Sequence, residues 1–354
     1  MTYKAAGSQL RTDLEAVVNG LDGLKFLDHQ AGRAAWQRFA DQLVVVDRDL
    51  AIVAADPGFS LELCIACWEY DWNHSGAIDE RDRRMFEIEF DGRATPNADG
   101  ELDDSIPEGD PRRRPTFKFD VGDADWARAM VSFQRAAMEI ILAYRWSELD
   151  RLFGDSSADG QDVKKIVLHL GDAARVTRAR ELILSGVGYA DRCRTAYLAE
   201  TDDDREWVPN PTQRSHPIPL DVDVRLYETW AGVTGDVHRM LTSEEGLSFK
   251  AIAALGDDDF PQLVPDAYLD LGAMLREPRD IELDLSLVST LFGRGDQANR
   301  KQVLEKFLRG VLGKGYASNM KPSPLVGRLH RMKTELSTGN ETFERKLRYL
   351  LWLN

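Results

Sequence analysis

Apolar residues recur at helical spacing along most of this chain. The clearest stripe follows Asp123 and Asp125, either of which can cap a helix, and continues to about Leu152. Its members are Trp126, Met130, Phe133, Ala137, Ile140, Ile141 and Tyr144. Such a stripe is typical of a helix that packs in a core, so the pattern predicts a central packing helix here.

Similar spacing predicts further helices on both sides of this one. They cover residues 8–48, 172–199, 222–243, 297–312, 323–337 and 341–353. Stretches of extended character predict short strands at 116–121, 164–170 and 277–285. Alternation over residues 59–67 favours another strand, although Leu61, Cys64 and Ile65 also share a helical face. Prolines between residues 208 and 220 exclude regular structure there.

One polar connection interrupts this pattern. Residues 91–115 are rich in turn-forming residues and have no period, which predicts a surface excursion. Within it we expect Arg112, Arg113 and Arg114 to pair with neighbouring carboxylates; a basic binding patch is the alternative. The predicted organisation is residues 1–90 with N-terminal helices and a candidate loop, the excursion at 91–115, and a main helical region at 116–354. These parts can also form one continuous domain.

The composition is that of a globular protein of 354 residues with a formal net charge of −15. An acidic surface argues against a nucleic-acid partner, because nucleic acids carry the same sign of charge. No apolar run approaches the roughly 20 residues that span a bilayer, and the N-terminus lacks the apolar core of a signal peptide. We expect a location outside the cytoplasm, in the periplasm or at the cell surface, with a signal absent from this chain. The cytoplasm is the alternative.

Residues 71–82, DWNHSGAIDERD, place oxygen-bearing side chains at alternate positions. Calcium loops of this length place their ligands at positions 1, 3, 5, 7, 9 and 12, with a glycine at position 6 for a sharp turn. Gly76 occupies the sixth position, and the apolar Ile78 occupies the eighth. The candidate calcium ligands are Asp71, Asn73, Ser75, the backbone carbonyl of Ala77, Asp79 and Asp82.

This stretch resembles the EF-hand superfamily at each of these positions, and the resemblance is confined to these residues. It ends in Asp82, as the loops of dockerin modules do, rather than in the usual and longer Glu. Ser75 also removes one negative charge compared with the commoner Asp. Both features imply weak binding, with a dissociation constant of about 10⁻⁵ to 10⁻³ M. The alternative is a polar turn before a helix, capped by Asp79 or Glu80.

No second calcium loop accompanies this one in the sequence. The stretches 95–106 and 155–166 carry glycine at the sixth position, but both end in isoleucine, which offers no side-chain ligand. A lone loop on a large domain is more typical of a structural site than of a sensor.

Other candidate chemistry is sparse. Cys64 and Cys67 form the stretch CIAC, for which a redox pair and half of a zinc site are alternatives. We expect small buried thiols instead, because a thioredoxin-like context and a second ligand pair are both missing. The six histidines form no HxxxH or HExxH pair, and we find no nucleophile–base constellation.

We therefore expect a mainly α fold: a large helical domain with a few short strands next to a single EF-hand-like loop. The expected function is that of a calcium-stabilised structural or binding protein, with Ca²⁺ as cofactor and a protein partner in the binding case. The sequence assigns no catalytic residue and favours a non-enzymatic role without deciding it. The alternatives are a hydrolase-like enzyme whose site combines scattered Asp and His residues, and a dockerin-like partner-binding module.

Overall fold

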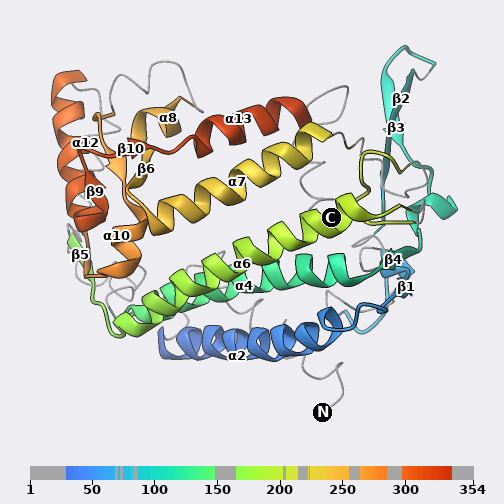
Figure 1. The fold of residues 1–354 in the computed structure, drawn as a ribbon, viewed down its shortest axis with the longest axis horizontal. Coiled ribbons are helices and arrows are strands. Elements are labelled where there is room, and N and C mark those ends of the chain that lie inside the picture. The colour runs from blue at the N-terminus through green and yellow to red at the C-terminus, as the bar shows by residue number, and fades with distance from the viewer. Residues whose placement is uncertain are drawn as a thin grey trace. The chain divides into compact units, whose positions relative to one another are not determined.

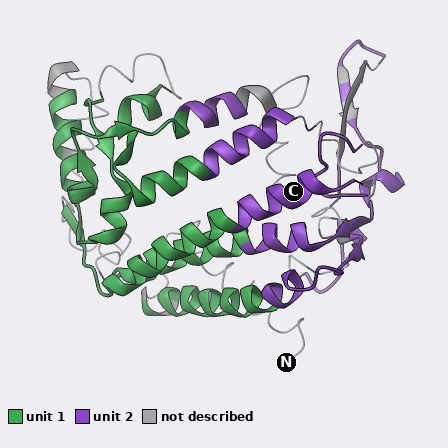
Figure 2. Cartoon of the chain, viewed as in Figure 1, with its two compact units in different colours: residues 1–49, 129–188, 235–326 green, residues 50–128, 189–234, 327–354 purple. Residues whose placement is uncertain are grey.

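The computed structural model divides the chain into two compact units, each built from separate stretches (Figure 2). Unit 1 comprises residues 1–49, 129–188 and 235–326, and unit 2 comprises residues 50–128, 189–234 and 327–354. The structure describes residues 29–67, 71, 75–80, 82, 87–96, 98–147, 165–201, 205–213, 222, 224–254, 264–284 and 297–336. This part of the chain is mainly α-helical with short strands, which confirms the predicted fold class (Figure 1).

Long helices form most of the described chain (Figure 1). They are α2 (His29–Ala54), α4 (Val121–Ala143), α6 (Ala173–Ala199), α7 (Val224–Thr242), α12 (Gln297–Leu312) and α13 (Leu325–Leu336). Five of them confirm the helices predicted at 172–199, 222–243, 297–312 and 323–337 and the central packing helix. Helix α2 confirms the second half of the 8–48 prediction and continues six residues further, to Ala54. Residues 1–28 and the predicted helix at 341–353 lie outside the described residues.

Helix α4 ends nine residues before the predicted Leu152. The carbonyl oxygen of Ala143 accepts hydrogen bonds from the backbone N–H groups of Gly171 (2.7 Å) and Asp172 (3.0 Å). The guanidinium of Arg33 donates to the carbonyl oxygens of Leu142 and Tyr144. Donors that are distant in sequence therefore hydrogen-bond to the last carbonyl groups of α4. A further helical turn would need these same carbonyl groups as acceptors. Sequence periodicity does not contain this information.

The cap of α4 is Asp120, not the predicted Asp123 or Asp125. The carboxylate of Asp120 accepts from the N–H groups of Gly122 (2.6 Å) and Asp123 (3.4 Å). Asp123 reciprocates, because its carboxylate accepts from the N–H of Asp120 at 3.0 Å. This reciprocal arrangement is a capping box, which satisfies N–H groups that the first helical turn leaves unbonded.

Small residues set how closely α4 and α6 approach within unit 1. A Cβ atom at Gly186 of α6 would lie 2.7 Å from Cε1 of Phe133 on α4, so only glycine fits beside that ring. The most deeply buried positions of α4 in this unit are Ala129, Ser132, Leu142 and Ala143. The predicted stripe member Ala137 is exposed. The face of α4 that packs in the core is therefore rotated about the helix axis from the predicted stripe, and it is formed largely by small residues of the helix.

Short strands complete both units. In unit 2, β1 (Leu61–Leu63) pairs antiparallel with β4 (Phe117–Phe119), and β2 (Phe90–Pro96) pairs with β3 (Leu102–Ser105). In unit 1, β5 (Lys165–Leu168) pairs antiparallel with β8 (Ile281–Asp284). A four-stranded sheet in unit 1 has the order β10 (Lys321–Pro322), β6 (Glu245–Ser248), β7 (Tyr268–Leu269), β9 (Tyr316–Ala317). The short helical elements are η1 (Ile65–Cys67), η2 (Pro111–Arg113), α8 (Phe249–Ala253), α10 (Leu271–Arg276) and η3 (Gly313–Gly315).

The segment 91–115 is more ordered than the predicted surface excursion. Strands β2 and β3 form a hairpin that extends from unit 2 (Figure 1), with Gly100 at a φ of +80° in its turn. After the hairpin, Ile106 is buried, and its carbonyl oxygen accepts two hydrogen bonds from the guanidinium of Arg113. Backbone pairing and an arginine–carbonyl contact hold this polar segment, and neither produces a hydrophobic period.

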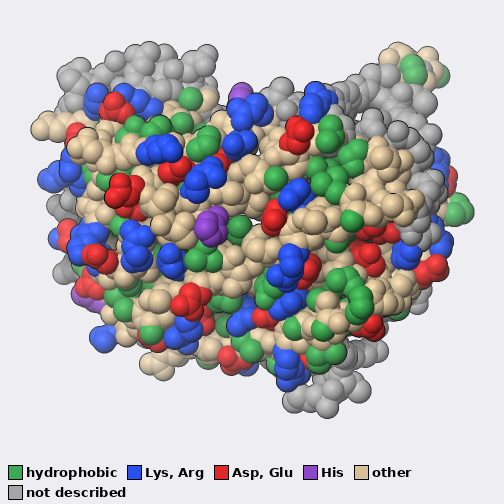
Figure 3. Space-filling view, in the orientation of Figure 1, with side chains coloured by type: hydrophobic (Ala, Val, Ile, Leu, Met, Phe, Trp, Pro, Cys, Tyr) green, Lys and Arg blue, Asp and Glu red, His purple; other side chains and the backbone are tan. Residues whose placement is uncertain are grey.

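The surface carries charges of both signs. On the face in Figure 3, Lys and Arg side chains are interspersed with Asp and Glu side chains. Among the described residues, no helix combines the length and apolar character that a membrane crossing needs.

Candidate functional site

The predicted calcium loop lies in unit 2, and its first half is organised by Asp71. The carboxylate of Asp71 accepts hydrogen bonds from the backbone N–H groups of Ser75 (3.0 Å) and Gly76 (2.9 Å). Gly76 has a φ of +88°, the left-handed conformation that the sixth position of a calcium loop requires. The hydroxyl of Ser75 donates to the carbonyl oxygen of Ala77 at 2.8 Å. The backbone therefore turns sharply at the glycine, as predicted.

Asp79 and Asp82 organise the second half of the loop. The N–H of Asp79 donates to the carboxylate of Asp82 (3.1 Å), and the N–H of Asp82 donates to the carboxylate of Asp79 (3.2 Å). Glu80 and Asp82 are helical. The pair is thus a capping box at a helix start, and it shows the helix cap that the alternative interpretation required. Asp82 is buried, at 2% exposed, whereas Asp79 is exposed.

Hydrogen bonds among the described loop residues form two groups. Asp71 contacts the Ser75–Gly76 turn, and Asp79 contacts Asp82. Within the described part of the chain, no three His, Cys, Asp or Glu side chains converge closely enough to hold a metal ion. Asn73 lies outside the described residues.

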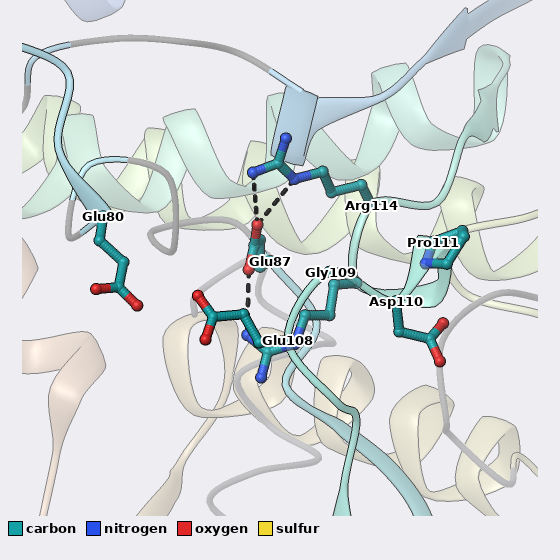
Figure 4. Close-up of a pocket in the computed structure, with 8 residues that line it drawn as sticks. Glu80, Glu87, Glu108, Gly109, Asp110, Pro111 and Arg114 are labelled. Carbon is teal, nitrogen blue, oxygen red and sulfur yellow. Dashed lines mark hydrogen bonds and ion pairs between the residues drawn. The ribbon is translucent and has the colours of Figure 1, made fainter.

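A pocket of about 310 Å³ lies beside the loop in unit 2 (Figure 4). Glu87 lines this pocket, and two arginines bind its carboxylate. Nε and Nη2 of Arg114 both lie 2.8 Å from Oε1 of Glu87, and Nη1 of Arg113 lies 3.2 Å from Oε2. The Glu87 side chain is 9% exposed and that of Arg113 is 12% exposed. Because Glu87 is buried and Arg113 largely so, removal of either charge would leave the other poorly compensated, which is costly.

The remaining pocket wall is acidic. Figure 4 shows the carboxylates of Glu80 and Glu108 facing the same space below Glu87, whereas that of Asp110 points away. Glu80 also belongs to the calcium-like loop, so the loop and the pocket share a residue. Asp110 caps η2 by accepting from the N–H of Arg112 and pairs with its guanidinium at 2.9 Å.

These contacts confirm that the three arginines pair with carboxylates. Arg112 binds Asp110, whereas Arg113 and Arg114 bind Glu87. Arg113 does not lie on the surface as the predicted excursion implied, because its side chain is largely buried. No local pattern points to Glu87, because its partners lie 26 and 27 positions further along the chain.

The two cysteines near the loop differ from expectation. Cys64 and Cys67 are joined by a disulfide, with their Cα atoms 5.2 Å apart. Cys67 is exposed and Cys64 is half-buried, so the prediction of two small buried thiols is wrong. The intervening Ala66 is the buried member of this stretch.

A second chemical feature of unit 2 is a group of buried carboxylates where α4 begins and α6 ends. The phenol of Tyr197 donates to the carboxylate of Asp123 at 2.6 Å, and both side chains are buried. Burial raises the pKa of Asp123 to about 7, although the hydrogen bond from Tyr197 opposes the shift. A Cβ atom at Gly122 would lie 2.9 Å from the Tyr197 ring, so glycine permits this contact.

Glu200 follows α6 and extends this group. Burial raises the pKa of Glu200 to about 9, and the nearby charge of the buried Glu206 adds to the shift. One carboxylate oxygen of Glu200 accepts from the side-chain amide of Gln213 at 3.1 Å. The other oxygen has no hydrogen-bond partner among the described residues. A protonated carboxyl group is the form that such a site favours.

Asn210 fixes the end of α6 at this group. Its side-chain amide donates to the carbonyl oxygens of Tyr197 (3.1 Å) and Glu200 (3.0 Å). Its side-chain oxygen accepts from the N–H and hydroxyl groups of Thr212. The stretch after α6, irregular as predicted up to residue 213, is therefore a buried cap. The spacing of Asp120 and Asp123 in the sequence was a usable signal for the capping box. No sequence signal indicated that Asp123 would meet Tyr197 of α6.

Comparisons with protein-family models, with curated proteins and with solved structures find no match for this chain.

Proposed function

We propose that this protein is a calcium-stabilised binding protein. In this proposal, residues 71–82 hold a calcium ion through Asp71, Asn73, Ser75, the carbonyl of Ala77, Asp79 and Asp82. The ion stabilises the segment that forms the adjacent pocket, and the pocket binds a small polar ligand.

The backbone of the loop carries this proposal. Gly76 has the positive φ that a calcium loop needs at its sixth position, and the Asp71 carboxylate already accepts from the N–H groups of Ser75 and Gly76. The donor set consists only of oxygen atoms, which are the ligands that calcium prefers. Both the donor chemistry and the turn therefore fit the ion.

The side chains support weak rather than tight binding. The carboxylates of Asp79 and Asp82 are engaged with each other's backbone N–H groups. A calcium ion competes with these hydrogen bonds for the same oxygens, which adds to the weakness expected from Asp82 and Ser75. We expect a dissociation constant in the range of about 10⁻⁵ to 10⁻³ M.

The pocket supports the binding part of the proposal. Its volume of about 310 Å³ is at the lower end of the range for small-molecule sites. Its walls carry Glu80 and Glu108 beside the arginine-bound Glu87. Such a lining suits a small ligand with several polar groups rather than an apolar one.

A thermal-unfolding comparison tests the calcium site. Melting the full chain in calcium and then in chelator should show higher stability with calcium, by about 2.7 kcal/mol at a hundredfold excess over the dissociation constant. Magnesium at the same concentration should give a smaller shift, because it demands a tighter octahedral geometry. Equal midpoints in 10 mM calcium and in chelator contradict the proposal.

A pair of matched variants excludes a general charge effect. Asp71→Asn neutralises the first ligand of the loop, and Asp99→Asn removes one negative charge from the β2–β3 turn. Only Asp71→Asn should strongly reduce the calcium-dependent shift. Loss of the shift in both variants would show that calcium acts on the acidic surface in general.

The hydrolase alternative has one observation in its favour. Asp123 and Glu200 have a raised pKa, and raised pKa values cluster at acid–base sites. Burial where α4 begins and α6 ends also explains both raised pKa values. His216, the histidine considered for such a site, lies outside the described residues. Hydrolysis of ester or phosphoester substrates that Asp123→Asn abolishes, without loss of folding, would favour this alternative.

A dockerin-like module remains a further proposal, which capture of a defined protein partner only in calcium would support.

A further inference from the structure

The Cys64–Cys67 disulfide lies at the surface of unit 2, four residues before the calcium-like loop. Cys67 is exposed, Cys64 is half-buried, and the two are separated by only three positions. A third cysteine, Cys193, is fully buried and lies in helix α6. The chain thus has one accessible sulfur pair and one inaccessible thiol.

We infer that Cys64 and Cys67 form a redox-active pair that exchanges with low-molecular-weight thiols such as glutathione. This activity is independent of the proposed calcium site and of the pocket. It requires that the disulfide open and close in the folded protein.

The spacing argues against a purely structural role. A disulfide stabilises a protein chiefly by restricting the unfolded chain, and the restriction grows with the length of the loop that it closes. A bond between positions i and i+3 closes one of the shortest loops available and restricts the unfolded chain little. Exposed disulfides are also the ones that are commonly labile or catalytic.

The local fold keeps the two sulfurs adjacent when the bond is open. The N–H of Cys67 donates to the carbonyl oxygen of Cys64 at 3.1 Å, which closes the 3₁₀ turn η1. Ala66 is buried beneath this turn, and β1 is paired with β4 immediately before it. These contacts do not depend on the disulfide. The reduced pair therefore stays positioned for rapid reclosure at a high effective concentration.

Exposure distinguishes the two sulfurs. An incoming thiolate can reach Cys67 directly, whereas Sγ of Cys64 lies 3.5 Å from the carbonyl oxygen of Arg114. In the reduced state that carbonyl can accept a hydrogen bond from the Cys64 thiol. Cys67 is therefore the sulfur that is attacked, and Cys64 is the resolving cysteine.

The exchange proceeds in two balanced steps. A glutathione thiolate attacks Sγ of Cys67, the Cys64–Cys67 bond breaks, and Cys64 leaves as a thiolate that takes a proton from water. A second glutathione thiolate then attacks the glutathione sulfur of the mixed disulfide and releases Cys67 as a thiolate. The protein disulfide gains two electrons, and two glutathione molecules are oxidised to glutathione disulfide.

A redox titration of the folded, full chain tests this inference. The protein is equilibrated at a series of reduced-to-oxidised glutathione ratios, alkylated with N-ethylmaleimide, and its labelled cysteines are counted by peptide mass. Cys64 and Cys67 should become labelled together as the ratio rises, and Cys193 should stay unlabelled. A pair that stays oxidised at every ratio until denaturant is added overturns the inference. So does a pair that is labelled even in oxidised glutathione alone.

Single-cysteine variants test which sulfur is attacked. Cys64→Ser leaves the exposed Cys67, and Cys67→Ser leaves the half-buried Cys64. In oxidised glutathione, Cys64→Ser should form the mixed disulfide at least about tenfold faster than Cys67→Ser. Equal or reversed rates overturn the assignment of Cys67. Cys193→Ala is the matched control and should leave the titration of the pair unchanged.

Discussion

Tyr197 and Asp123, 74 positions apart in the chain, are joined by a hydrogen bond of 2.6 Å between phenol and carboxylate in the core of unit 2. The bond connects the C-terminal end of α6 to the capping box that starts α4. Because the carboxylate is buried, its proton affinity depends on the fold, and the stability of the fold depends on pH.

Stability should fall as the pH rises from about 5 to 9. The folded protein holds protons on Asp123, with a pKa raised to about 7, and on Glu200, with a pKa raised to about 9. The unfolded chain has released most of both protons by about pH 5, since the ordinary values are 3.8 and 4.5. The folded state therefore binds more protons across this window, so the free energy of unfolding decreases with pH until each folded pKa is passed. Urea unfolding midpoints at pH 5, 7 and 9 measure this decrease in stability.

Two variants assign this pH dependence. Both groups contribute to the slope below about pH 7, so Asp123→Asn should remove about half of the slope there. Glu200→Gln should remove the other half together with the part that continues to about pH 9. Midpoints that stay constant or increase between pH 5 and 9 in the wild-type protein contradict the assignment.

Tyr197→Phe should destabilise the protein by about 1–3 kcal/mol, because it removes the phenol donor from one oxygen of a buried carboxyl group. The pKa of Asp123 should rise further, since the hydrogen bond from Tyr197 lowers it. The pH-dependent loss of stability should therefore extend to higher pH. Denaturant unfolding across the same pH range measures both effects.

Tyr189→Phe is the matched control on the same helix. The Tyr189 hydroxyl accepts from Arg128 at 2.6 Å, but its ring is half-buried and keeps its contact with the Arg128 guanidinium. A loss below about 1 kcal/mol and an unchanged pH profile are expected. A similar change in the pH profile of stability in Tyr197→Phe and Tyr189→Phe would mean that the change comes from α6 as a whole and not from the bond to Asp123.

Arg113→Ala should cost more stability than Arg114→Ala, although both residues bind Glu87. Arg113 is largely buried and also donates twice to Ile106, so its removal should cost about 3 kcal/mol. The Arg114 side chain is 41% exposed, and its removal should cost at most about 1 kcal/mol. Chemical unfolding of the two variants measures the difference. Equal losses would mean that burial does not govern this cluster.

Gly76→Ala should weaken calcium binding, whereas Gly100→Ala should not. Both glycines have a positive φ, +88° and +80°, and neither has an atom within 4 Å of an added Cβ. Each substitution should therefore cost a similar strain of about 1–2 kcal/mol. Calorimetric titration with calcium separates the two, because only Gly76 lies in the proposed ion loop. Equal affinity in both variants argues against an ion at this loop.

The sequence by itself determined the main helices and the sharp turn of the loop. The 3.6-residue period of α6, α7 and α12 is a local property, and it placed their ends within about two residues of those observed. The glycine at position 76 likewise reports a backbone requirement of its own position.

Only the tertiary structure decided which side chains meet. The end of α4 depends on Arg33, and the β2–β3 hairpin depends on backbone pairing that has no apolar period. The contacts of Tyr197 with Asp123 and of Arg113 with Glu87 join residues 74 and 26 positions apart. Their strength comes from burial, which is created by packing and is not encoded at any one position. The sequence could therefore point to the loop, but the pocket, the proton-holding carboxyl groups and the accessible disulfide emerged only from the fold.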